Sequence, residues 1–388
     1  MPQLPVYMDN HATTPVDPRV VEAMLPWFTE KFGNAASVNH AFGWEAADAV
    51  QQARDQVARL LGSQPESVVF TSGATEANNL ALKGVMQAAG PTGHLLTNAA
   101  EHRAVLDPVK KLERRGYEAT ILPVDSDARV DPAAVASALR PDTRLVSVML
   151  ANNEVGSLNL IAEIGRLCRE NQVLFLVDAV QAIGRIPVDA AELGADLLSL
   201  TAHKVYGPKG VGALWIRRDG NHIPIESQID GGGHERRLRS GTLAVPSIVG
   251  FGAACEIAGD SLAEESRRIG DLRDRLWDGL CGKCDGLHLN GHTQQRLPGN
   301  LNVSFEGVDG DALMMGLKDL AVSSGSACTA ADPEPSHVLR AMGRSDPLTR
   351  ASLRFGLGRF NTADEVEFAI SYVADVVMRL RQDANAGA

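Results

Sequence analysis

The segment with the clearest chemical character is a run of small and polar residues around Cys328. Residues 323–329 read Ser-Ser-Gly-Ser-Ala-Cys-Thr, and no apolar periodicity follows Val322. A cysteine that serves packing usually lies in an apolar core, whereas loops of small polar residues more often carry function. A thiol in such a loop could transfer sulfur, attack an electrophile or bind a metal.

An aspartate and a lysine each follow a run of apolar residues that is typical of a buried strand. Asp178 ends one such run, and ligand crevices lie at the carboxyl ends of parallel strands; capping the next helix is the ordinary alternative. Gln181 would face the same way if a helical turn follows. Lys204 stands beside His203 and a Gly/Pro turn, where burial would lower its pKa and make its amine a candidate for a Schiff base.

Residues 72–76, Ser-Gly-Ala-Thr-Glu, are expected at a turn from a strand into a helix. The amides and the dipole at a helix N-terminus favour a phosphate, and Gly73 allows close backbone approach. Alone, this turn is more simply an ordinary helix start. Together with Asp178 and Lys204 it forms the set that pyridoxal 5'-phosphate (PLP) requires: a carboxylate for the pyridinium nitrogen, an amine for the Schiff base and a phosphate site.

The elements that must position these residues alternate between strand and helix over the first two thirds of the chain. Amphipathic helical patterns, such as Trp44 to Leu61 before Gly62, separate the apolar runs. This alternation predicts an α/β fold with a mostly parallel sheet covered by helices on both faces. Strands are expected at residues 67–71, 94–97, 145–150, 174–178, 197–201 and 212–216.

The pattern changes after about residue 258. A charged helix is expected at 262–280, an alternating segment at 300–305, and then a long C-terminal helix. Thr362 and Glu365 have the spacing of a capping box at the start of that last helix. This part of the chain predicts a smaller α+β domain.

Composition limits the class of protein. The chain has 388 residues, 44% hydrophobic and 22% charged, with a formal net charge of −11, which argues against binding to nucleic acid or an anionic membrane. No apolar stretch could span a bilayer, and the first residues lack the pattern of a signal peptide, so we expect a cytoplasmic protein. The five scattered cysteines suggest free thiols; Cys281 and Cys284 have metal or redox spacing, which helical placement explains as well.

The chain resembles the cysteine desulfurases, which share PLP-dependent transferase fold type I with aspartate aminotransferases. The Cys328 loop resembles the group with a long mobile cysteine loop, which includes the housekeeping iron–sulfur enzymes. The resemblance implies a large PLP-binding domain over 16–258 and a small domain formed by 1–15 and 259–388, which carries the Cys328 loop. It extends from Tyr7 to Phe360 and rests on residues 72–76, 97–102, 152–154, Asp178 with Gln181, His203-Lys204, 239–242 and the Cys328 loop.

The resemblance implies a role for each residue around the PLP ring. Lys204 binds PLP as a Schiff base and serves as the base for the substrate α-proton. Asp178 pairs with the pyridine nitrogen, and Gln181 contacts the phenolic oxygen. His102 stacks on the ring and is a candidate acid–base group. Cys328 takes the sulfur from the substrate.

The phosphate and the substrate have implied contacts as well. Ala74, Thr75, Thr201 and His203 line the phosphate site, and Thr242 reaches it from the second subunit of a homodimer. At Thr201-Ala202 many relatives have Ser-Gly, and the threonine keeps the hydroxyl.

Asn153 and Arg354 hold the substrate carboxylate, for which an arginine fork is suited. Asn153 is also expected among the cofactor contacts.

The implied reaction converts L-cysteine to L-alanine and a persulfide on Cys328. The sulfur would go to an iron–sulfur scaffold, to other thio-cofactors or to tRNA thiolation, and Cys328 could be a transient metal ligand of a cluster forming on the scaffold. A selenocysteine lyase, or another PLP-dependent lyase or aminotransferase, is the alternative among enzymes. A sulfur carrier or scaffold-binding protein with a degenerate cofactor site would lack the lysine or the aspartate, and both are in place.

Overall fold

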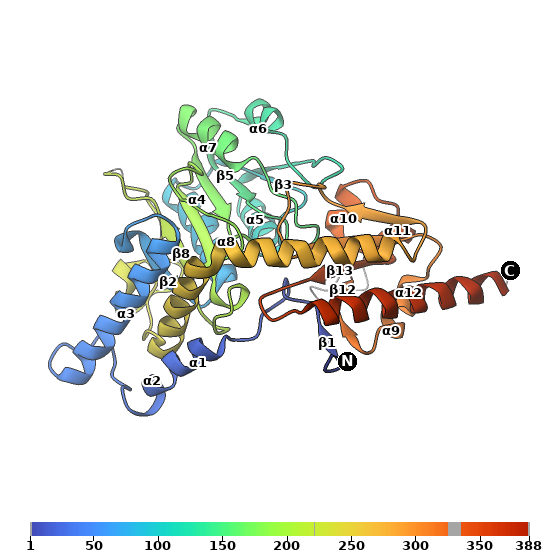
Figure 1. Cartoon of the computed structure of the whole chain (residues 1–388). Helices are drawn as coiled ribbons and strands as arrows, with labels where there is room; N and C mark the ends of the chain where they lie inside the picture. The colour runs from blue at the N-terminus through green and yellow to red at the C-terminus, as the bar shows by residue number, and fades with distance from the viewer. Residues whose placement is uncertain (1, 221, 325–334, 387–388) are drawn as a thin grey trace.

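A computed structural model gives the structure of residues 2–220, 222–324 and 335–386 (Figure 1). Cys328 lies outside these described residues. Within them, no helix combines the length and the apolar character needed to cross a membrane.

The largest element is a seven-stranded sheet in which every strand is parallel to the others except β8, which is antiparallel to both of its neighbours. The expected strands are confirmed to within two residues at either end. The edge strand β4 was not expected, because its residues are mostly half-buried or exposed instead of forming an apolar run. In spatial order the strands are β2 (Val68–Thr71), β8 (Gly212–Ile216), β7 (Leu197–Thr201), β6 (Leu174–Asp178), β5 (Thr143–Met149), β3 (His94–Asn98) and β4 (Glu118–Leu122).

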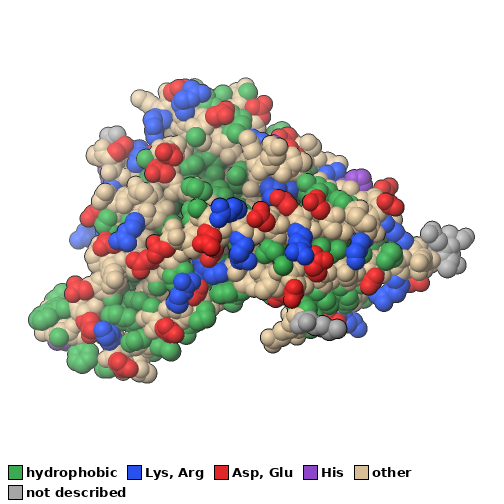
Figure 2. Space-filling model, viewed as in Figure 1, with side chains coloured by type: hydrophobic (Ala, Val, Ile, Leu, Met, Phe, Trp, Pro, Cys, Tyr) green, Lys and Arg blue, Asp and Glu red, His purple; other side chains and the backbone are tan. Residues whose placement is uncertain are grey.

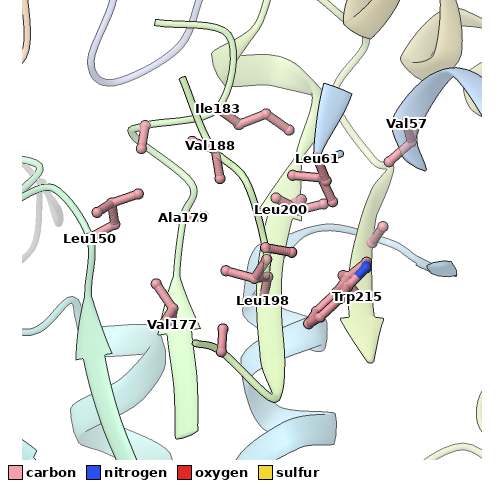
Figure 3. Packing of buried hydrophobic residues seen from close by; sticks show 14 of the residues in the cluster. Val57, Leu61, Leu150, Val177, Ala179, Ile183, Val188, Leu198, Leu200 and Trp215 are labelled. Carbon is pink, nitrogen blue, oxygen red and sulfur yellow. The ribbon is translucent and has the colours of Figure 1, made fainter. Parts of the chain in front are cut away.

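Helices cover both faces of this sheet, and successive strand residues point to opposite faces. Leu176 belongs to the cluster that packs on α4 and α5, whereas Val177 belongs to the cluster that packs on α3, α6, α7 and α8. Figure 3 shows part of the second cluster, where Leu198, Leu200 and Trp215 of the sheet meet Val57 and Leu61. The helices are α3 (Ala41–Leu60), α4 (Ala74–Ala88), α5 (Arg103–Glu113), α6 (Pro132–Ala138), α7 (Ile161–Glu170) and α8 (Val245–Cys281), preceded by α1 (Pro18–Met24) and α2 (Pro26–Thr29).

A second, antiparallel sheet has the order β12, β13, β10, β9 and its own core. A short parallel pair, β1 with β11, brings the N-terminal segment to its edge. The capping box is confirmed: the Glu365 amide donates to Thr362 Oγ1 at 3.3 Å, and the Thr362 amide to Glu365 Oε2 at 2.9 Å. The elements are β1 (Val6–Tyr7), β9 (Leu287–Asn290), β10 (Asn300–Phe305), α9 (Gly310–Gly316), β11 (Leu320–Ala321), β12 (Ser323–Ser324), α10 (His337–Ala341), α11 (Asp346–Arg350), β13 (Ser352–Gly356) and α12 (Ala363–Ala386).

The helix expected at 262–280 is the second half of α8, which starts 17 residues earlier and has 37 residues in all. The first half of α8 is rich in small and apolar residues because it packs into the core of the large sheet, for example through Ile248 and Phe251. The second half packs into the second core through Leu276 and Leu280. The change in composition near 258 therefore marks a change of packing partner within one continuous helix (Figure 1). The division into two domains at this position stays a prediction.

Candidate active site

A cavity of about 590 Å³ lies where β5, β6 and β7 end and α4 begins. This is the edge of a parallel sheet at which ligands usually bind. Ten of the residues predicted from the sequence line it: Ala74, Thr75, His102, Asn153, Asp178, Gln181, Thr201, His203, Lys204 and Arg354. The fold thus brings together residues that are up to 280 positions apart in the chain.

The turn before α4 has the form of an anion site. Gly73 precedes the helix with φ of 152°, a backbone conformation that favours glycine. The amide of Ser72 donates to Glu76 Oε2 at 2.9 Å, which closes the turn. Among the described residues no side chain caps the start of the 15-residue α4, so its first backbone amides can donate to a phosphate beside Thr75 and Thr201.

Asp178 is the last residue of β6, and its two carboxylate oxygens are both held. Oδ2 accepts from Asn78 Nδ2 on α4 at 2.9 Å, and Oδ1 accepts from the Val180 amide at 3.0 Å. Asn78 was not predicted, because its only sequence signal is its place one turn after Ala74 on the same helix. The fixed carboxylate lines the cavity, as a partner for a ring nitrogen requires.

Lys204 lies in the 3₁₀ turn Ala202–Lys204 that follows β7. Its Nζ donates to the carbonyl oxygens of His11 at 2.5 Å and Ala12 at 2.6 Å. The N-terminal segment is therefore part of the cavity wall, and it is anchored there because the Thr14 amide donates to the His203 carbonyl at 3.0 Å.

Two histidines in the cavity wall have pKa values below the ordinary range because burial disfavours their charged forms. Burial lowers the pKa of His203 to about 4, and it also lowers the pKa of His102. His102 Nδ1 accepts from the Ala104 amide at 3.0 Å. The neutral ring of His102 therefore carries its proton on Nε2, where it can donate.

Gln181 connects the cavity to a cationic residue beneath it. Its Nε2 donates to the His11 carbonyl at 3.0 Å, and its Oε1 accepts from Arg185 at 2.9 Å. Arg185 also donates to the Asn10 carbonyl at 2.6 Å. Sequence reasoning did not identify Arg185 or His11 as site residues, since nothing in their local sequence indicates that they meet.

Arg354 of β13 forms the opposite wall. It donates to the Asn153 carbonyl and to Asp9 Oδ1, both at 2.9 Å. Among the described residues, no partner hydrogen-bonds to the buried Arg354 Nε or Asn153 Oδ1. A substrate carboxylate could accept here from Arg354 and from the side-chain NH₂ group of Asn153.

The comparison with family models gives a match to Aminotransferase class-V over residues 6–368. The chain belongs to this family.

The curated relatives include proteins named cysteine desulfurase IscS from Anaeromyxobacter dehalogenans (strain 2CP-C), 56% identical over 383 residues, and from Methylococcus capsulatus (strain Bath), 54% identical over 381 residues; each alignment covers 98% of this chain and 94% of the relative. Among solved structures, a NifS-like protein is 38% identical with a TM-score of 0.90, covering 97% of this chain and all of the other. A structure described as SspA in complex with cysteine is 34% identical with a TM-score of 0.82, covering 92% and 99%. The expected fold class and family are confirmed.

Enzymes of this family use PLP, and the residues present fit it. The fixed carboxylate of Asp178, the amine of Lys204 and the turn before α4 lie around one cavity of suitable size. His102 and Gln181 lie in the wall between them. Asp178 would pair with the pyridine nitrogen and Lys204 would hold the aldehyde carbon.

Thr242 and Cys328 are the two remaining predicted site residues. Thr242 is exposed and does not line the cavity of its own subunit. Cys328 lies outside the described residues. Their predicted roles stay predictions.

Proposed function

We propose that the protein is a cysteine desulfurase, which converts L-cysteine to L-alanine and carries the sulfur as a persulfide on Cys328. The observation that carries this proposal is the convergence of Asp178 and Lys204 with Arg354 and Asn153 around one cavity. The curated relatives named cysteine desulfurase, at 50–56% identity, support the same reaction.

Different residues of the cavity bind the substrate, remove its α-proton and stabilise the cofactor. Arg354 and Asn153 bind the substrate carboxylate and so place the amino group toward Lys204. The Lys204 amine takes the proton from the substrate α-carbon. PLP, when bound, supplies the sink for the electrons of that bond, and the charge of Asp178 stabilises its protonated nitrogen.

The sulfur step is balanced without an external oxidant. The Cys328 sulfur forms a bond to the substrate sulfur, and the carbon–sulfur bond of the substrate breaks with its electron pair left on the β-carbon. That carbon takes a proton, for which His102 Nε2 is a candidate donor. The proton released by the Cys328 thiol then restores the proton that His102 has lost. Lys204 returns the α-proton to the substrate α-carbon, so the products are L-alanine and the Cys328 persulfide.

The proposal includes a homodimer in which Thr242 of one subunit contacts the phosphate in the other. Large apolar side chains exposed on the described surface support an interface, since monomeric proteins rarely expose such patches. They gather over α1, α2 and the start of α3 at the lower left of Figure 2, and comprise Leu25, Phe28, Phe32, Val38, Phe42 and Trp44, each more than half exposed.

The further partners follow from the chemistry. A persulfide must be passed to a thiol or cluster-assembling protein, so we propose an iron–sulfur scaffold or another sulfur acceptor, with Cys328 as a transient metal ligand during transfer. The four described cysteines are free thiols, which fits the reducing cytoplasm that we propose as the location.

The test is the variant Cys328→Ala, with Cys281→Ala as the control. Cys281 is an exposed cysteine outside the cavity. We expect Cys328→Ala to keep the visible absorption of bound PLP and to lose multiple-turnover sulfide release from L-cysteine, and Cys281→Ala to keep both. Full sulfide release by Cys328→Ala would refute the role of this thiol. Greater alanine release from L-selenocysteine than from L-cysteine would favour the lyase alternative.

A further inference from the structure

The segment from Gly231 to Thr242 contains a backbone feature that the proposed reaction does not use. Glu235, Arg236 and Arg237 have φ angles of 45°, 57° and 67°. Three consecutive non-glycine residues in the left-handed region are unfavourable, since Cβ crowds the following carbonyl oxygen. Such conformations persist only where the surroundings enforce them, and they cluster at functional sites.

A buried ion pair enforces this turn. The carboxylate of Glu235 accepts from both terminal nitrogens of Arg54, at 2.7 and 2.8 Å, and from the Phe70 amide at 2.7 Å. The two side chains are 8% and 2% exposed. The turn is therefore fixed to helix α3 and to the edge strand β2, which leads directly into the phosphate turn at Ser72.

The other end of the segment is fixed to that phosphate turn. Arg239 Nε donates to Glu76 Oε1 at 2.8 Å, and Glu76 Oε2 accepts from the Ser72 amide at 2.9 Å. Thr242 comes three residues after this anchor and is exposed. The segment is thus attached to its own subunit at both Glu235 and Arg239, and it presents the threonine outward.

We propose that the Arg54–Glu235 pair is a positioning device for the phosphate site of the second subunit. The pair holds the left-handed turn, and the turn sets the direction in which Thr242 leaves the surface. This inference rests on the homodimer and on the role of Thr242 proposed above. Because Arg239 is hydrogen-bonded to Glu76 beside the phosphate turn of its own subunit, the same segment connects the two phosphate sites of the dimer.

The chain offers a matched control for the chemistry of this pair. Asp196 accepts from Arg217 Nε at 2.7 Å and from the Phe175 amide at 2.7 Å. It is likewise a carboxylate shared between an arginine and a strand amide of the large sheet. However, Asp196 precedes β7, at the end of the parallel strands opposite the cavity. A purely structural role for either pair predicts the same consequences for both.

The first experiment compares Glu235→Gln and Arg54→Met with Arg217→Met. The apo dimers are titrated with PLP by visible absorbance, and thermal unfolding of the same apo proteins is recorded. We expect the two variants of the Arg54–Glu235 pair to bind PLP about tenfold more weakly, the loss expected for one charge-assisted hydrogen bond. Arg217→Met should keep the PLP affinity even where its unfolding temperature falls as much. Equal PLP affinities across all three variants and the unaltered protein would overturn the proposal.

A mixed dimer separates action across the interface from action within one subunit. One subunit carries Glu235→Gln and the other carries Lys204→Ala, with different affinity tags. Borohydride then fixes PLP covalently, at subsaturating PLP, only where Lys204 is present. We expect the Glu235→Gln subunit to fix more PLP in the mixed dimer than in its own homodimer, because its site now receives an intact segment from the second subunit.

Absence of that recovery would overturn the proposal. Neither measurement requires turnover. If the unaltered protein bound PLP but released no sulfide from cysteine, the proposed function would fail while the role of the pair could still be judged.

Discussion

The two walls of the cavity are built in different ways. The wall of Asp178, Lys204 and Thr75 consists of a strand end, a turn that follows a strand and the first turn of a helix, all on the mostly parallel sheet, so each residue follows directly from its own element. The wall of Arg354 and Asn153 joins two sheets and the N-terminal segment through hydrogen bonds between distant residues. Arg354 bonds Asn153, 201 positions away, and Asp9, 345 positions away.

This difference indicates a division of tasks. The first wall is held by the core of the large sheet and can bind a cofactor of constant shape. The second wall depends on bonds between separately packed parts of the chain, among them Ser323 Oγ, which accepts from Arg354 at 3.0 Å immediately before the Cys328 segment. Changes in the first wall should therefore affect PLP chemistry, and changes in the second should affect substrate binding.

The largest expected effect is that of Lys204→Ala in the first wall. The variant loses both the amine that holds PLP covalently and the base for the α-proton, so kcat should fall by about 10⁴-fold or more. PLP should still bind through Asp178 and the phosphate turn, without a borohydride-reducible link. Covalent PLP on a different lysine of the variant would contradict the assignment.

Arg354→Met should separate the second wall from the first. Losing the charged donor for the substrate carboxylate should raise KM for L-cysteine by about 100-fold, within the range of a charge-assisted hydrogen bond. The visible spectrum of bound PLP should stay unchanged, because Asp178 is held by Asn78 and the Val180 amide, and Lys204 donates to the His11 and Ala12 carbonyls. Loss of PLP from this variant would show that the walls are not independent.

The same difference explains how far the sequence could be interpreted. Asp178 and the 72–76 turn were predicted because a strand end and a helix start are local patterns of apolarity and small residues. Arg354 was identified only through the family resemblance, since its neighbours read as an ordinary strand. Sequence patterns did not reveal Asn78, Arg185 or Asp9. Each contacts a partner at least 100 positions away, and Arg185 does so through a backbone carbonyl, so these contacts leave no periodic signal in the sequence.

A third prediction concerns Glu154, next to Asn153 in the second wall. It is buried, and its Oε2 accepts from Ser336 Oγ, just after the Cys328 segment. Burial raises its pKa to about 7 from 4.5. Between these pH values the unfolded chain has lost the proton that the folded protein keeps, so the free energy of unfolding falls as pH rises through this window, by about 3 kcal/mol in total.

Glu154→Gln should remove this pH dependence. The amide of the variant keeps a hydrogen-bond acceptor for Ser336. The free energy of unfolding of the variant, relative to that of the unaltered protein, should therefore rise from pH 4.5 to pH 8. Urea unfolding of both proteins at both pH values measures this difference. Burial also raises the pKa of Glu101, to about 8, but both proteins contain Glu101, so its contribution cancels. A constant difference between the two proteins at both pH values would contradict a buried, protonated Glu154.

The smallest expected effect tests whether the first wall also depends on a bond between elements. Asn78→Ala removes the amide that holds Asp178 Oδ2 but leaves the bond from the Val180 amide to Oδ1. The carboxylate should remain in place with a looser orientation, so kcat should fall by about tenfold, the equivalent of one hydrogen bond to a charged group. KM for L-cysteine should stay the same, since the Asn78 side chain donates to Asp178 in the first wall and, among the described residues, to no residue of the second wall. An increase in KM that matches Arg354→Met would mean that the two walls respond as one unit, and the proposed division of tasks would then be wrong.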